Sequence, residues 1–341
     1  MMGQAGANKI FQRILPLFSS RLFKSIAYLF GMLILISIIS FLAIHAAPDS
    51  FMAAGGLNPK MTEENIQALK AIYGLDKSLV EQYFSWVGNL LTLNFGVSFT
   101  TGELVVTEIK ERLGITLFIS LFTLVIVFLS SLYLGIKAGL NPHSRFDKFV
   151  KQLSLISFSM PSFYLAILLM LVFSVVFDLF PVTGLHSIGV DEDAFFTYYL
   201  DMLWHLVLPL IVIIFVSIGS MTMYVRSLVI NIMKSDYITF AQARNIDKSI
   251  IIRRFVFPNL VPPIVTLLGL SLPGLLGGSI ILEQIFSIDG MGRLFYNSAL
   301  SHDYPVIMGL LMMTAFLTLL GNMIADAILL KLNPFFKRSH A

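Results

Sequence analysis

The sequence has no cysteine, so disulfides and thiolate-bound metal sites are excluded. It is also poor in charge, because only 13% of its 341 residues are Asp, Glu, Lys or Arg, against roughly 25% in a typical soluble domain. Hydrophobic residues make up 57% of the chain and the mean hydropathy is +0.84. Much of the protein surface must therefore face lipid. The net charge of +3 is too small to indicate a nucleic-acid partner.

Long uncharged runs predict helices that span a membrane. A helix needs about 20 mainly apolar residues to cross the hydrocarbon core, whereas a barrel strand needs only about 10 alternating ones. Six runs without Asp, Glu, Lys or Arg reach the helical length: 25–47, 113–136, 152–177, 202–225, 255–282 and 304–325. The first exceeds the roughly 7–15 apolar residues of a signal peptide, so we interpret it as an anchor. The expected fold class is an all-α integral membrane protein with six transmembrane helices.

Basic residues predict the topology of these helices. Most of the 23 Lys and Arg residues lie in the N-terminus, in 137–151, in 226–254 and in the C-terminus. The positive-inside rule then places both termini in the cytoplasm. The long segment 48–112 is consequently external. Thr62 as an N-cap and Gly74 as a stop predict a short helix within this external cap.

The connection 227–258 carries the clearest functional signal. Its segment 236–246 has the pattern of a short helix that Ser235 or Asp236 would cap. Asn245 would end it, since Asn tolerates the left-handed conformation better than most residues. The helical spacing places four residues on one face: Tyr237, Phe240, Ala241 and Arg244. Spacing alone leaves open an ordinary amphipathic connector close to the lipid headgroups.

The same segment is similar to a loop of the permeases in ATP-binding-cassette (ABC) importers. That loop centres on a Glu-Ala-Ala triplet, followed by a glycine and an apolar-Pro element. In this sequence the corresponding elements are Phe240-Ala241-Gln242-Ala243, then Asn245, then Phe257-Pro258 or Val261-Pro262. The acidic residue of the triplet is absent and the glycine is replaced by asparagine.

A longer set of motifs resembles the peptide and nickel permease family of these importers, in the family's order and over about 21–334. The motifs are Tyr73-Gly74-Leu75-Asp76, Gln82-Tyr83, Phe95-Gly96-Val97-Ser98-Phe99, Met160-Pro161-Ser162-Phe163, Asp236-Tyr237, Gly274-Leu275-Leu276-Gly277-Gly278-Ser279, Glu283-Gln284-Ile285-Phe286, Gly290-Met291-Gly292-Arg293 and Asp303-Tyr304-Pro305-Val306. Asn333-Pro334 stands where the family often has Asp-Pro.

The resemblance implies a domain organisation and a site. Residues 1–20 would be a cytoplasmic N-terminal segment, 21–334 an importer-type transmembrane domain, and 335–341 a cytoplasmic tail. Within the domain, 48–112 would form the external cap and 227–258 the coupling loop, whose helix seats in a cleft of the ATPase subunit. The residues expected to couple to the ATPase are Asp236, Tyr237, Phe240, Ala241, Ala243, Arg244 and Asn245.

The sequence does not predict ATP hydrolysis by this chain. No Gly-x4-Gly-Lys-Ser/Thr motif occurs, nor any Gly-Lys pair. We therefore expect a transport subunit that is not an enzyme and has no cofactor, with ATP bound by its partners. The resemblance implies a second homologous permease, two ATP-binding subunits, an external substrate-binding protein and the lipid of a bacterial inner membrane.

Proline and glycine interrupt the predicted spans. Such residues are tolerated in membrane helices where neighbours or water satisfy the freed carbonyls. They either kink the helices or line a transport pathway. The candidate pathway residues are Pro161, Pro273, Gly274, Gly277 and Gly278. Glu283, at an external edge, is expected to be a solvated or a helix-packing group.

Short peptides are the favoured cargo, and nickel or a nickel chelate is the alternative within the family. No histidine pair has metal-ligand spacing on a helix, so no permanent metal site is expected. Four histidines share the predicted external side: His45, His186, His205 and His302. A secondary transporter or channel remains as a rival, but would usually show mid-span charges or an inverted repeat. A membrane enzyme would need a Ser–His or paired-Asp constellation inside the spans.

Overall fold

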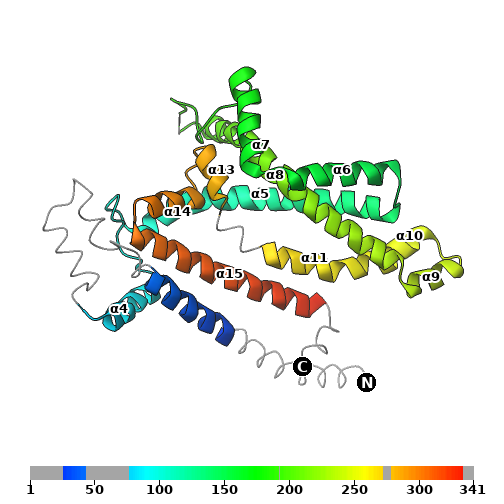
Figure 1. Ribbon diagram of the computed structural model, residues 1–341, viewed down its shortest axis with the longest axis horizontal. Coiled ribbons are helices and arrows are strands. Elements are labelled where there is room, and N and C mark those ends of the chain that lie inside the picture. Colours follow the sequence, from blue (N-terminus) through cyan, green and yellow to red (C-terminus); the bar gives the residue numbers. More distant parts are fainter. Residues whose placement is uncertain (1–25, 44–76, 192, 272–277, 333–341) are drawn as a thin grey trace. The chain divides into compact units, whose positions relative to one another are not determined.

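The computed structural model describes residues 26–43, 77–191, 193–271 and 278–332. The described parts are almost entirely helical. Their elements, in order, are the helix Ile26–Ala43, α4 (Leu79–Leu91), α5 (Val105–Leu140), α6 (Arg145–Ser159), α7 (Ser162–Leu169), the π-helix η1 (Met170–Val176), α8 (Phe195–Met233), α9 (Asp236–Ala243), α10 (Lys248–Ile251), the π-helix η2 (Ile252–Val256), α11 (Phe257–Ser271), α13 (Ile280–Ile285), α14 (Met291–Leu300) and α15 (Tyr304–Leu332) (Figure 1). The helix predicted after Thr62 and the terminal segments 1–20 and 335–341 lie outside the described residues.

Length and hydropathy confirm a multi-pass membrane protein. Five of the described helices can cross a bilayer: Ile26–Ala43, Val105–Leu140, Phe195–Met233, Lys248–Gly269 and Tyr304–Ile324. The helices Arg145–Ser159 and Ser162–Val176 are long and apolar enough only when taken together, and they are bent by 96°, so they form either a broken sixth span or a re-entrant loop. The predicted third span is therefore sharply broken. The break falls at Met160-Pro161, because a proline cannot continue the hydrogen-bonding ladder of the preceding helix.

The chain forms two compact units. The first comprises 1–108 and 298–324, and the second comprises 109–297 and 325–341. The core of the first unit contains Phe41, Phe99, Tyr304 and Met308, against which Tyr83 and Trp86 pack. The carboxylate of Asp303 lies beside this core and accepts hydrogen bonds from the loop that precedes α5.

The second unit depends on close helix packing. Gly135 and Gly139 of α5 face Val225 and Val229 of α8, and a Cβ atom added at either glycine would lie 2.7 Å from the valine Cβ. Small residues let membrane helices approach closely, which is how helices associate without a hydrophobic driving force. Val225 and Val229 also pack on Val256, so α8 contacts η2 as well.

A second core joins α7, α8 and α13 within the same unit. It contains Leu165 and Ala166 of α7, Leu206 of α8 and Leu282 and Phe286 at α13. The helix α8 has 39 residues, and at 1.5 Å per residue it is about 58 Å long, nearly twice the roughly 30 Å of a hydrocarbon core. At least one end of α8 therefore extends into water, and the short helices α9 and α10 follow its C-terminal end.

Candidate functional site

The helix α9 has the predicted stop, but the predicted side-chain cap at its start is not formed. Ser235 is its N-cap residue, but the serine hydroxyl donates to the Ile232 carbonyl at 2.5 Å instead of capping the helix. Asn245 has a φ of +54°, which confirms the predicted left-handed stop. The Asn245 amide donates to Gln242 and the Ile246 amide donates to Ala241, the two bonds of a Schellman motif. Asparagine thus adopts the left-handed conformation that glycine most often supplies at a helix end.

One face of α9 is packed within the chain. Ile238 and Ala241 are buried together with Ile251, and the side chains of Met233, Ile246 and Phe255 cover them. Ala241 is 3% exposed, whereas we predicted that it shares a face with the exposed aromatic residues. The difference arises because this loop needs its own small core to hold α9, and a small side chain fits there. A role for Ala241 in coupling stays a prediction.

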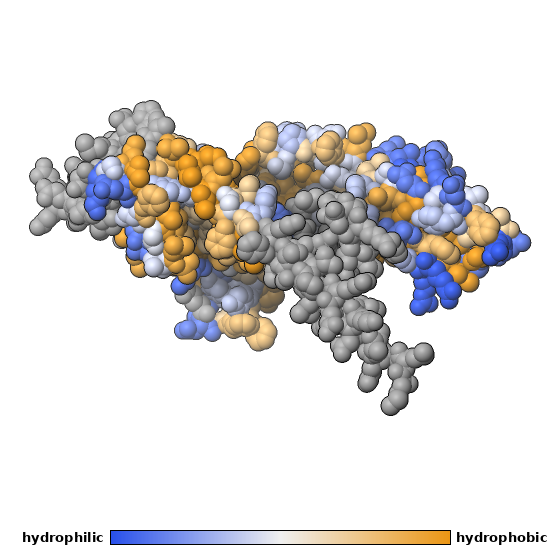
Figure 2. Space-filling view, turned by 90° about the horizontal axis from the view of Figure 1, so that it is seen from below, coloured by the Kyte–Doolittle hydropathy of each residue, from blue (hydrophilic) through white to orange (hydrophobic). Residues whose placement is uncertain are grey.

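The opposite face of α9 is exposed and carries aromatic and basic side chains. Phe240 is 61% exposed, and the Arg244 guanidinium lies 4.8 Å from the centroid of its ring. Asp236, Tyr237, Ala243 and Asn245 are exposed as well. Hydrophilic residues gather at the end of the second unit that bears α9 and α10 (Figure 2). We call the six residues Asp236, Tyr237, Phe240, Ala243, Arg244 and Asn245 the α9 surface.

A cavity of about 820 Å³ lies within the second unit. Its apolar wall comes mainly from α5 and α8, and includes Phe128 and Tyr224. The polar lining residues are Ser120, Thr123, Ser217, Ser220, Ser271, Ser279 and Glu283. Among the predicted pathway residues, Gly278 lines this cavity and Pro161 does not, while Pro273, Gly274 and Gly277 lie outside the described residues.

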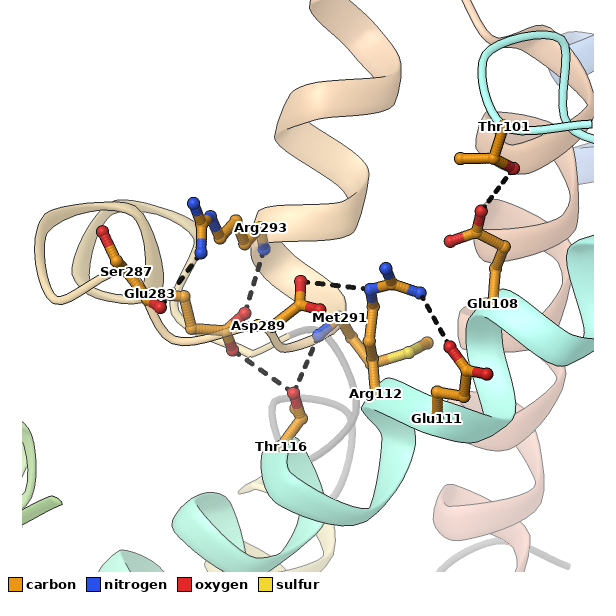
Figure 3. A network of polar contacts seen from close by, with 10 residues as sticks. All are labelled: Thr101, Glu108, Glu111, Arg112, Thr116, Glu283, Ser287, Asp289, Met291 and Arg293. Atoms are coloured by element: carbon orange, nitrogen blue, oxygen red, sulfur yellow. Dashed lines mark hydrogen bonds and ion pairs between the residues drawn. The ribbon is translucent and has the colours of Figure 1, made fainter. Parts of the chain in front are cut away.

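Glu283 is among the residues that line this cavity, and it is a buried packing group that is only 4% exposed. Its Oε2 accepts the Arg293 amide at 2.9 Å, and the Thr116 hydroxyl lies 3.4 Å from its Oε1 (Figure 3). The same hydroxyl accepts the Met291 amide at 2.9 Å. A Cβ atom at Gly290 would lie 2.5 Å from Oε2. The motifs Glu283-Gln284-Ile285-Phe286 and Gly290-Met291-Gly292-Arg293 therefore form one folded loop around this carboxylate.

The sequence contains both motifs of this loop, but their spacing does not predict that they surround a buried carboxylate. Only the structure shows that Gly290 and Gly292 leave room for the Glu283 carboxylate. Arg112 on α5 extends the same polar region, because its Nε lies 3.1 Å from the Asp289 carboxylate. The sequence alone does not indicate that Arg112 and Asp289 form a pair, because they lie 177 positions apart.

Two of the four histidines considered for nickel meet at one carboxylate. The Nδ1 atoms of His186 and His205 lie 3.4 and 3.7 Å from Oδ2 of Asp201. The His205 Nδ1 is also 2.8 Å from the Asp201 carbonyl, and the His186 ring stacks on Tyr198. Within the described residues, no group of three or more His, Cys, Asp or Glu has the arrangement of a metal site. His45 lies outside the described residues, and His302 belongs to the other unit.

Comparison with known proteins places the chain in a family. Residues 131–338 match the model of the "binding-protein-dependent transport system inner membrane component", and residues 20–121 match the N-terminal model of the same systems. The oligopeptide transport system permease protein AppB of Bacillus subtilis is 31% identical over 92% of this chain and 96% of its own length. The dipeptide transport system permease protein DppB of Lactococcus lactis is 30% identical over 91% of this chain and 97% of its own.

A more distant relative is named for a different cargo. The peptidoglycan transport system permease protein YejB of Agrobacterium fabrum is 29% identical over 84% of this chain and 78% of its own length. The family match, the helical fold and the apolar spans agree with one another. The chain belongs to the family of binding-protein-dependent transport system inner membrane components, the ABC importer permeases, and is a multi-pass protein of the bacterial inner membrane.

Proposed function

We propose that this chain is the permease subunit of an ATP-driven ABC importer and forms the translocation pathway for short peptides that an external binding protein delivers. The observation that carries the proposal is the α9 surface. A rigid helix, fixed by a Schellman stop and an inner apolar face, presents Phe240 and Arg244 outward. Burial of this surface in the cleft of a partner would be favourable, since it would remove from water the apolar area of the Phe240 side chain, which is 61% exposed.

The partners follow from the family. Two ATP-binding subunits would seat the α9 surface on the cytoplasmic side, and a second homologous permease would complete the pathway. ATP would be hydrolysed on the partner subunits, and this chain would change conformation without performing chemistry. The helices α8 and η2, which flank α9 and share the core of Val225, Val229 and Val256, would carry the movement toward the spans.

The cavity supports peptide as cargo. Its polar lining consists mainly of hydroxyl side chains on an apolar wall, and no Lys, Arg or His is among its described lining residues. Hydroxyls donate and accept hydrogen bonds, so they match peptide amides of any sequence. The relatives named for oligopeptide and dipeptide transport favour the same class. Nickel is the second candidate, and the pair His186 and His205 at Asp201 is the feature that would favour it.

Uptake in cells tests the proposal. A strain lacking the gene is compared with the same strain after the gene is restored, using a labelled tripeptide and, separately, labelled nickel. We expect restored tripeptide uptake with nickel uptake unchanged. Restored nickel uptake alone would overturn the peptide assignment, and uptake that survives removal of the ATPase subunits would favour a secondary transporter or channel.

A further inference from the structure

We propose that the turn between α5 and α6, together with the first turn of α6, is a positioning element for ATPase coupling, because this segment is bonded to the chain before and after the loop that carries α9. The turn comprises residues 141–144, and Asp147 lies in the first turn of the following helix. This inference rests on the proposed function, since it assigns a route by which the movement of α9 reaches the broken span.

The first bond joins α6 to α8, before the loop. The Arg226 guanidinium binds both oxygens of the Asp147 carboxylate, with Nη2 at 3.0 Å from Oδ2. The Asp147 side chain has no exposed surface, and that of Arg226 is 13% exposed. Asp147 Oδ2 also accepts the backbone amide of His143 at 2.8 Å. A bidentate, desolvated arginine–carboxylate pair fixes orientation as well as distance.

The second bond joins the same turn to α10, after the loop. The Lys248 ammonium donates to the Asn141 side-chain carbonyl at 3.2 Å. Leu140, at the end of α5, lines a small cavity together with Met233, Asn245 and Ile246 of the loop. The α5–α6 turn and the first turn of α6 are thus bonded to α8 before the loop and to α10 after it, and the turn, α9 and α10 lie at the same end of the second unit (Figure 1).

The helix α6 connects this anchor to the broken span. The Ser157 hydroxyl donates to the Phe215 carbonyl of α8 and accepts the Gly219 amide at 3.1 Å, so α6 is bonded to α8 along its length. Two residues after Ser159 the chain bends by 96° into α7. The side chains of α7, including Leu165 and Ala166, pack in one core with α13, the helix that carries Glu283.

A displacement of α9 thus has a packed route to the cavity wall. Packed cores have discrete arrangements and do not deform continuously, so a bonded chain of helices moves as a body. Asp147 and Arg226 are positioning residues in this route, because neither lies among the residues that line the large cavity. Their loss should change how much transport each ATP hydrolysis produces.

The test uses the complete importer in liposomes and measures tripeptide taken up per ATP hydrolysed. We expect Asp147→Asn to lower this ratio about tenfold or more while ATP hydrolysis continues, within the range of measured coupling effects. Arg226→Gln should have the same effect, and the double variant should be no worse than either single one. Lys148→Gln, an exposed lysine on the same helix, is the matched control and should keep the wild-type ratio.

The exposed bond supplies a test that does not disturb a buried charge. Lys248→Met and Asn141→Ala should each lower the ratio about twofold to fivefold, and together no further. An unchanged ratio in the Asp147 and Lys248 variants would overturn the inference, as would transport and hydrolysis falling in proportion. A wild-type complex that hydrolyses ATP but takes up no tripeptide would instead contradict the proposed function.

Discussion

The Ser98 hydroxyl donates to the Asp303 carboxylate at 2.5 Å and joins residues 205 positions apart. The amides of Phe99 and Thr100 donate to the same carboxylate at 3.1 Å each. Ser98 and Asp303 are each only 2% exposed. The motifs Phe95-Gly96-Val97-Ser98-Phe99 and Asp303-Tyr304-Pro305-Val306 therefore meet in one clamp, in which the buried Asp303 carboxylate accepts the Ser98 hydroxyl and the amide of the buried Phe99.

The first prediction concerns this clamp. Asp303→Asn replaces one acceptor oxygen with an NH₂ group that faces donors, so at least one buried N–H or O–H loses its partner. We expect a loss of about 1–3 kcal/mol in the free energy of unfolding. Thermal unfolding of the purified protein in detergent measures it. Glu103→Gln, at an exposed position of the same loop, is the control, and an Asp303→Asn variant as stable as this control would contradict the role of the carboxylate.

The second prediction concerns the close contact of α5 and α8. A Cβ atom at Gly135 would lie 2.7 Å from the Cβ of Val225, so Gly135→Ala must push the two helices apart. We expect it to cost about 1–3 kcal/mol through overpacking. Val225→Ala removes the opposing methyl groups and should recover part of that loss. Gly114→Ala is the matched control on the same helix, since nothing lies within 4 Å of its added Cβ.

Unfolding in detergent again gives the measurement for these glycine variants. Gly135→Ala and Gly114→Ala differ only in what the new methyl group meets, so helix propensity cancels between them. Equal stability of the two variants would show that α5 and α8 do not approach as closely as the structure has them.

The third prediction concerns the α9 surface. Phe240→Ala should weaken the ATPase contact by removing an exposed aromatic ring, and Ala243→Glu should abolish coupled transport while the protein stays in the membrane. Truncating an aromatic residue at the centre of an interface typically costs about 2 kcal/mol or more of binding. Co-purification of the ATPase subunits and peptide-dependent ATP hydrolysis measure the two effects. Phe149→Ala is the control for Phe240→Ala, because Phe149 on α6 is similarly exposed. Peptide-dependent ATP hydrolysis at the wild-type level in Ala243→Glu would contradict the assignment of the α9 surface.

The membrane spans could be predicted from the sequence, because a segment that crosses lipid must be long, apolar and uncharged. An uncharged, apolar run of about 20 residues is typical of a membrane span, since a surface helix of a soluble protein keeps a polar face toward water. The sequence also predicted the stop at Asn245, because the left-handed conformation is a local preference of the residue. Local rules of this kind depend on a few neighbouring residues, so a single sequence contains them.

Features that depend on distant partners could not be predicted in the same way. Ala241 is buried because Ile251 and Phe255 cover it, and nothing in the spacing of α9 indicates which face they take. Pro161 predicted an interruption, but the 96° bend depends on the packing of α7 against α8 and α13. Glu283 was expected at a membrane edge as a solvated or packing group, and only the loop that returns through Gly290 decides between the two.

The last prediction tests that loop. Glu283→Gln keeps the size of the side chain but turns an NH₂ group toward donors, one of which is the Arg293 amide. Gly290→Ala places a methyl group 2.5 Å from the present position of Oε2, so it should displace the same carboxylate from the other side. Both changes should lower tripeptide uptake while leaving the α9 surface able to bind the ATPase, because among the described residues α9 and this loop belong to different cores. Uptake and ATPase co-purification, measured on the same preparations, separate the two effects. Loss of ATPase binding together with uptake would mean that the variants fail to fold, whereas wild-type uptake in both would show that the buried carboxylate does not shape the pathway.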